Sequence, residues 1–131
     1  MTDLRALLAP IRARLAAATP GPWEGLLAGP RGEREWIVDS TSTFICSTQI
    51  DNQRGHSDGT LIANAPTDLA RLLAAIEAVG VLHEPGPGYY ASDVTCQACS
   101  NSIGYVRYPC PTVTALAAAL GSDTTNQEGT Q

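Results

Sequence analysis

The sequence predicts an α+β fold: an N-terminal helix, a small antiparallel sheet, a second long helix, then a cysteine-bearing hairpin and a short helix. Two observations carry this prediction. Leucine and isoleucine recur at helical spacing near the N-terminus and again over residues 60–80, whereas turn residues divide residues 23–50 into short strand-like runs. We expect an α+β core module over 1–80, a cysteine module over 81–120 and a disordered tail over 121–131.

The first helix is expected over residues 2–18. Five apolar side chains fall on one face of it: Leu4, Leu7, Leu8, Ile11 and Leu15. Pro10 weakens the pattern in the middle, and the two prolines of Thr19-Pro20-Gly21-Pro22 end it.

Three strands are expected next, over 23–28, 35–39 and 43–50, with the clearest turn at 29–32. They form an antiparallel meander. Cys46 alternates with Phe44 on the third strand, which favours a buried small side chain over a metal ligand.

A polar loop is expected over 51–59. His56 lies between Asp51 and Asp58, a grouping that could serve acid–base chemistry, but a solvated loop is favoured because no nucleophile accompanies it. A helix follows over 60–80, in which Pro66 separates a short first turn from the main segment.

The cysteine module contains all four tyrosines of the chain. Strands are expected over 89–95 and 103–108, on either side of Cys96-x-x-Cys99, and a helix is expected to begin at Pro111 and run through Leu120. The polar residues from 121 onward provide no apolar anchor.

A Cys-x-x-Cys turn directs two sulfurs at one point, as a tetrahedral metal requires. Cys96 and Cys99 supply two ligands and Cys110 a third, and His83 is the favoured fourth. We therefore predict a structural zinc site that staples the hairpin. The alternatives for the fourth ligand are Cys46, Asp93 and His56, and those for the site are a redox dithiol or an iron–sulfur cluster.

Charge and composition exclude several classes of function. The net charge is −5 and all eight basic residues are arginines, so the chain lacks the basic face of a nucleic-acid-binding protein. The N-terminus lacks the pattern of a signal peptide, and no run of residues is apolar enough for a membrane span. We expect a cytoplasmic protein with reduced or metal-bound cysteines.

Tyrosine and arginine dominate the contact energy of protein interfaces. Tyr89, Tyr90, Tyr105 and Arg107 crowd into the cysteine module, so they are the candidate binding residues. The alternative is ordinary packing around a small metal site. A catalytic zinc keeps an open position, which four protein ligands would close, so no enzymatic activity is expected.

Two sets of motifs carry a resemblance. The stretch Ala18-Thr19-Pro20-Gly21-Pro22-Trp23, with the run from Asp58 to Leu73, resembles phage Ead-like early-region proteins. Leu82-His83-Glu84-Pro85, the Cys-x-x-Cys pair and Tyr108-Pro109-Cys110-Pro111-Thr112 resemble the C-terminus of small actinophage and streptomycete proteins. This resemblance implies a phage or prophage accessory protein and supports His83 as the fourth ligand, but it brings no established activity. From the tyrosines and Arg107 we expect the protein to bind a host protein, in host takeover or counter-defence. The alternative is a sponge for a nucleotide defence signal.

Overall fold

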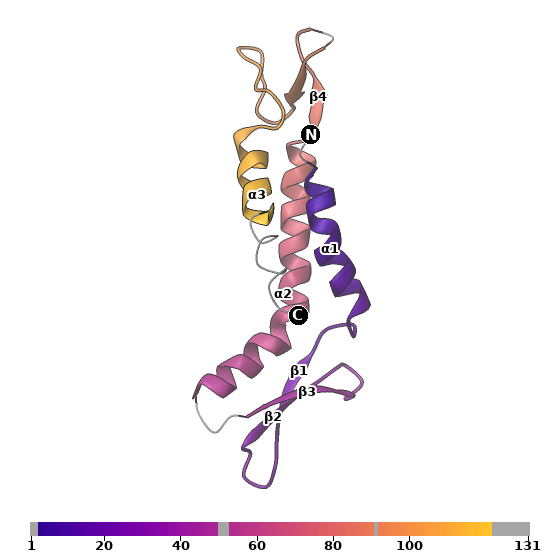
Figure 1. Cartoon of the computed structure of the whole chain (residues 1–131), viewed down its shortest axis with the longest axis vertical. Coiled ribbons are helices and arrows are strands. Elements are labelled where there is room, and N and C mark those ends of the chain that lie inside the picture. Colours follow the sequence, from indigo (N-terminus) through magenta and orange to yellow (C-terminus); the bar gives the residue numbers. More distant parts are fainter. Residues whose placement is uncertain (1–2, 50–52, 91, 122–131) are drawn as a thin grey trace, which may run out of the picture. The chain divides into compact units, whose positions relative to one another are not determined.

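The computed structural model describes residues 3–49, 53–90 and 92–121. It confirms the α+β class: a helix, a three-stranded antiparallel sheet, a long helix, a strand pair and a short helix follow one another (Figure 1). The chain divides into two compact units. The sheet unit comprises residues 12–72, and the metal unit comprises the chain up to residue 11 together with the chain from residue 73 onward.

The sheet has the predicted meander order β1-β2-β3. Its strands are Glu24–Ala28, Arg34–Val38 and Phe44–Gln49, with Leu26 opposite Trp36 and Ile37 opposite Cys46. The turn between β1 and β2 contains Gly29 and Gly32 at φ values of 88° and 66°. Only glycine adopts this backbone region without steric cost, so these two positions fix the hairpin.

The two faces of the sheet differ. Glu35 and Ile37, which alternate along β2, are buried on one face, whereas the rings of Trp36 and Phe44 on the other face meet edge to face at 5.7 Å and stay partly exposed. The pairing of β2 with β3 shifts between Ile37, which lies opposite Cys46, and Val38, which lies opposite Phe44. Phe44 therefore does not share the buried face of Ile37. A bulge of this kind re-aims side chains along one strand.

Helix α2 spans Gln53–Leu82, so the predicted loop is wrong over residues 53–59, which are helical. Residues 51 and 52 of that loop lie outside the described residues. Tertiary contacts explain the extension: the Thr48 hydroxyl donates to the Gly55 carbonyl at 3.3 Å, and Gly59 lies against the Glu35 carboxyl group. Such contacts outweigh the weak helix propensity of glycine.

Both helices continue through their prolines, so the predicted division at Pro66 is wrong. Pro66 is buried inside α2 and Pro10 lies inside α1, which spans Leu4–Ala17. The ring of Pro66 lies close to Gly21: the Cβ atom of Pro66 is 3.2 Å from the position that a Cβ atom would occupy at residue 21. Burial of the ring against the segment before β1 offsets the hydrogen bond that proline removes from the helix.

The hairpin of the metal unit is shorter than predicted. Strand β4 is Pro85–Pro87 and pairs with β5, Val94–Cys96, and only the Thr95–Arg107 bridge represents the expected second strand. Residues 89–90 form a bend outside the strands. Asn101 turns the chain, because its Oδ1 accepts the N–H groups of Ile103 at 2.8 Å and Gly104 at 3.1 Å.

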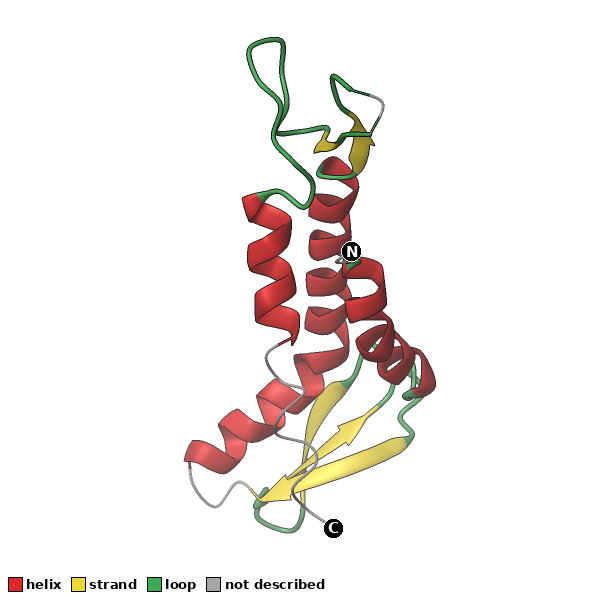
Figure 2. Cartoon of the chain, turned by 45° about the horizontal axis from the view of Figure 1, so that its top comes forward, coloured by secondary structure: helices red, strands yellow, loops and turns green. Residues whose placement is uncertain are grey.

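Helix α3 spans Pro111–Gly121 and lies beside the C-terminal part of α2, as both views show (Figure 2). One buried cluster of the metal unit consists of Leu4 from α1, Val113 from α3, and two cysteines, Cys96 and Cys110. None of the helices within the described ranges is both long and apolar enough to cross a membrane. The predicted tail lies outside the described residues from 122 onward.

Candidate metal centre

The four predicted ligands come from four different places in the metal unit. His83 follows the last residue of α2, and its N–H still donates to the Val79 carbonyl at 3.0 Å. Cys96 ends β5, Cys99 follows in the turn, and Cys110 directly precedes α3. Helix ends and a tight turn hold these positions more firmly than a long loop would.

The ligand atoms converge. The Nδ1 atom of His83 lies 3.4 Å from the sulfurs of Cys96 and Cys99 and 3.5 Å from that of Cys110. All four ligand atoms lie within 4.8 Å of one another. Tetrahedral zinc at ordinary bond lengths separates nitrogen from sulfur by about 3.6 Å and sulfur from sulfur by about 3.8 Å. The four side chains can therefore hold a metal ion, with Nδ1 as the histidine ligand.

Backbone hydrogen bonds shape the knuckle around the first two cysteines. The N–H of Cys96 donates to the Val106 carbonyl at 2.8 Å, and its carbonyl accepts from Ser100 N–H at 3.1 Å. The N–H of Gln97 donates to the Glu84 carbonyl at 3.1 Å, which ties the knuckle to the residue after His83. The ligands are thus linked through the main chain as well as through their side chains.

Ser100 is a supporting residue that sequence reasoning missed. Its Oγ accepts the N–H of Val106 at 3.0 Å and so joins the knuckle to the returning chain. The available signal was the polar run Ser100-Asn101-Ser102 directly after Cys99, which is typical of a turn with side-chain hydrogen bonds to the backbone.

The thiols differ in their electrostatic settings. Burial raises the pKa of Cys99 to about 11, and the neighbouring thiols of Cys96 and Cys110 add to this rise. The pKa of Cys110 is lowered to about 7: burial opposes the shift, but hydrogen bonds from Val113 N–H, the two other thiols and Thr112 N–H favour the thiolate. The start of α3 thus prepares one ligand for metal binding.

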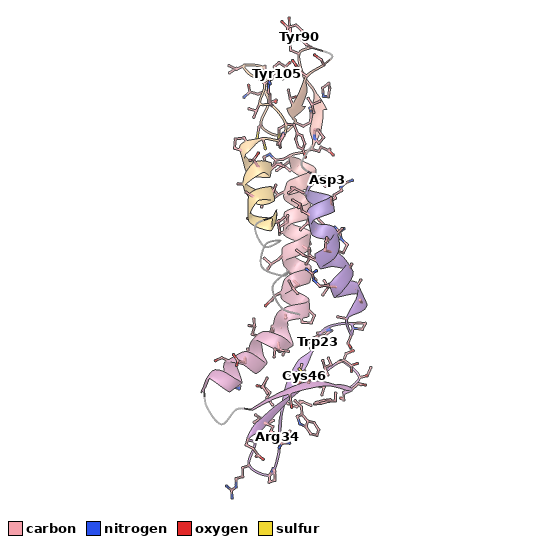
Figure 3. All side chains as sticks on the ribbon, in the orientation of Figure 1. Asp3, Trp23, Arg34, Cys46, Tyr90 and Tyr105 are labelled. Carbon is pink, nitrogen blue, oxygen red and sulfur yellow. The ribbon has the colours of Figure 1, made fainter. Side chains whose placement is uncertain are left out.

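None of the other candidate ligands belongs to this group. Cys46 is half-buried on β3 of the sheet unit, where Figure 3 labels it. His56 is on α2, with Nδ1 3.5 Å from the Glu35 carboxyl group. Asp93 accepts the N–H of Tyr90 at 3.4 Å. Within the described residues, the single converging group is His83 with the three C-terminal cysteines.

The predicted binding residues come together on the metal unit. The ring of Tyr89 lies 5.0 Å from that of Tyr90 and 6.4 Å from that of Tyr105, and all three are well exposed. Figure 3 shows Tyr90 and Tyr105 at the same end of this unit. Tyr105 and Arg107 line a cavity of about 600 Å³ that also reaches Asp93 and Thr95.

Comparisons with protein-family models, with curated proteins and with solved structures find no match to this chain. The resemblance to phage Ead-like proteins therefore stays a prediction.

Proposed function

We propose that this chain is a non-enzymatic accessory protein of the phage or prophage type, whose zinc-held C-terminal module binds a host protein in the cytoplasm. Zinc is the favoured metal because one imidazole and three thiolates form a complete tetrahedral set. Such a set leaves no position open for a substrate, which supports a structural role.

The observation that carries the binding role is the tyrosine surface, defined as Tyr89, Tyr90 and Tyr105. Three exposed rings, of which Tyr89 contacts the other two, form an apolar patch with polar hydroxyl tips. Exposed aromatic clusters of this kind are typical of the energetic centre of an interface. The metal centre would support the patch by fixing the two chain segments that carry it.

The metal is tested first. Elemental analysis of freshly purified protein is expected to find one zinc per chain, and an absence of stoichiometric metal would contradict the structural role. Binding is then tested with the zinc-loaded protein as bait in an actinobacterial extract. We expect a retained protein that the Tyr89→Ala/Tyr105→Ala double variant loses.

A matched control is available in the sheet unit. Phe44 is 55% exposed, as is Tyr105, and each of the two contacts another aromatic ring. The Phe44→Ala variant is expected to retain the same host protein. Loss of the partner by both variants, or by neither, would place the binding surface elsewhere.

A second candidate function is sequestration of a small nucleotide, which the cavity beside Tyr105 and Arg107 favours. Its volume of about 600 Å³ lies in the range of small-molecule sites. Mass spectrometry of a heat-released extract of the purified protein distinguishes the two: a stoichiometric nucleotide would favour the sponge over the protein binder.

A further inference from the structure

The short sheet of the metal unit has one protected edge and one open edge. Strand β4 forms the first edge, and it consists of Pro85-Gly86-Pro87. Its two prolines have no N–H to offer to another strand. The segment around Arg107 forms the opposite edge, through its bridge to Thr95 in β5.

The hydrogen bonds of that bridge fix the direction of the Arg107 backbone. The Cys96 N–H donates to the Val106 carbonyl at 2.8 Å, and the Tyr108 N–H donates to the Val94 carbonyl at 3.0 Å. Arg107 lies between these bonds, in a pair that exchanges none itself, so its own N–H and carbonyl point away from β5. Over the ranges 3–49, 53–90 and 92–121, these two groups have no hydrogen-bond partner.

The same alternation places the Arg107 side chain on the cavity side. Val106 packs against the core with Cys96, whereas Arg107, the next residue, faces the other side and lines the cavity together with Thr95. Tyr108 contacts the core and also borders this cavity. Arg107 is the only arginine or lysine after Arg71 in the sequence. Its guanidinium has no ion-pair partner among the residues that the structure describes, although Asp93 lines the same cavity.

We infer that the partner contributes an extended, acidic segment that pairs with the backbone of Arg107 and places a carboxylate on its guanidinium. This inference rests on the proposed function and names the chemistry of its partner. In an added strand, the residue opposite Arg107 exchanges backbone hydrogen bonds with it and lies on the same face. A glutamate there meets a guanidinium whose paired N–H groups fit a carboxylate.

The surroundings define the rest of the recognised segment. Residues two positions from the glutamate lie on the same face, and an apolar side chain there would pack on the exposed ring of Tyr105. Asp93 also lines the cavity and limits the negative charge that a ligand can bring there. Its carboxylate repels a phosphate dianion more strongly than it repels a single carboxylate of a ligand. An acidic peptide therefore fits this site better than a nucleotide.

The test uses the zinc-loaded full chain and synthetic peptides that are acetylated and amidated at their ends. The probe Thr-Val-Thr-Glu-Thr-Val-Thr is compared by calorimetry or fluorescence with the same peptide carrying glutamine at the centre. We expect the glutamate peptide to bind about tenfold more tightly, as a charge-assisted hydrogen-bonded pair provides. Methylation of the amide nitrogen of the glutamate is expected to weaken binding, because it removes one backbone hydrogen bond.

Protein variants complete the test. Arg107→Gln is expected to abolish the difference between the two peptides, and Arg107→Lys is expected to restore only part of it because an ammonium lacks the paired donors. Zinc content must stay at the wild-type value in both. Equal binding of the two peptides, no binding of either at millimolar concentration, or displacement of the glutamate peptide by equimolar inorganic phosphate would overturn the inference.

Failure of this inference differs from failure of the proposed function. If Tyr89→Ala/Tyr105→Ala loses the host protein but Arg107→Gln retains it, the tyrosine surface binds a partner without the acidic strand. If neither change affects the host protein, the proposed function fails as well.

Discussion

The two units of this chain are stabilised by different chemistry. In the sheet unit, aliphatic side chains of a three-stranded meander, such as Ile37 and Val38, are buried. In the metal unit, two of the six buried hydrophobic residues within the described ranges are cysteines whose sulfurs belong to the ligand group. The strand pair above that core has only three residues per strand. A metal can therefore support a region whose secondary structure is too short to be stable by itself.

The largest expected effect comes from breaking the ligand set. Cys99→Ala should lose the metal, because three ligands remain and structural zinc contributes about 10–16 kcal/mol of apparent binding free energy. Hydrogen exchange should then show loss of protection over residues 83–121, with protection retained in strands β1 to β3. Elemental analysis and exchange on the same sample measure both.

Cys46→Ala is the matched control for that experiment. Cys46 is a cysteine of intermediate burial, as Cys99 is, but it lies in the sheet unit. We expect this variant to keep one metal per chain. Metal loss from the Cys46 variant would show that the ligand set includes the third strand.

The next-largest effect is expected from a substitution in the core of the sheet unit. Ile37 is fully buried and lies opposite Cys46 in the sheet. Ile37→Ala should lower the free energy of unfolding of the sheet unit by about 2–5 kcal/mol, through lost burial and the cavity left behind. Metal content should stay unchanged, as measured by elemental analysis beside urea denaturation. A parallel loss of metal would show that the two units unfold together.

A third prediction uses the same substitution at two positions of one helix. A Cβ added at Gly59 of α2 would collide with the Glu35 carboxyl group. Gly25 of β1 lies against the same carboxyl group and restricts its movement. Gly80 has ordinary contact with Leu4, at 3.6 Å from its Cδ1. Gly80→Ala should stabilise by up to about 1 kcal/mol, from helix propensity.

Gly59→Ala should instead destabilise by about 1–3 kcal/mol, because the buried carboxyl group of Glu35 cannot retreat from one glycine without approaching the other. Thermal denaturation of the two variants measures the opposite signs. The collision is tested in the Glu35→Ala background, where Gly59→Ala should no longer destabilise. A destabilisation that persists there would assign the effect to another neighbour, such as the Thr48 hydroxyl 3.0 Å from the added Cβ position, and not to Glu35.

The difference between the units also explains what could be predicted from the sequence. The sheet, helices α1 and α3 and the Cys96–Cys99 pair follow from local patterns, since periodicity, turn residues and the Cys-x-x-Cys spacing each act over a few residues. His83 and Cys110 are distant in the sequence and were predicted from their residue types, as a tetrahedral site needs two further ligands. The helical state of 53–59 could not be predicted, because it depends on the contacts of Gly55 and Gly59 with residues Thr48 and Glu35 of the sheet. The strands expected at 89–95 and 103–108 shortened because Asn101 and the Tyr89–Tyr90 bend divert the chain.

The smallest expected effect is a difference in how the two units respond to acid pH. The pKa of Asp39, in the turn between β2 and β3, is lowered from its ordinary value of 3.8 by hydrogen bonds from the Thr41 hydroxyl and the N–H groups of Thr43 and Thr41. A carboxyl group whose pKa is depressed in the folded state stabilises that state at pH values above its unfolded pKa. This stabilisation is lost as the pH falls through the pKa of the folded state. The turn should therefore keep its order down to pH 3.8 and lose it only below that value.

This loss must be followed locally, since metal ligands also take up protons in acid and the metal unit responds separately. We expect the side-chain carboxyl resonance of Asp39 to titrate below 3.8, with the amide protection of Thr41 and Thr43 falling over the same range. Asp39→Asn keeps an acceptor oxygen but does not titrate, so protection of these amides should become independent of pH in that range. If they instead lose protection together with the residues around Cys96 and Cys110 at higher pH, the sheet unit depends on the metal and the two units do not respond separately.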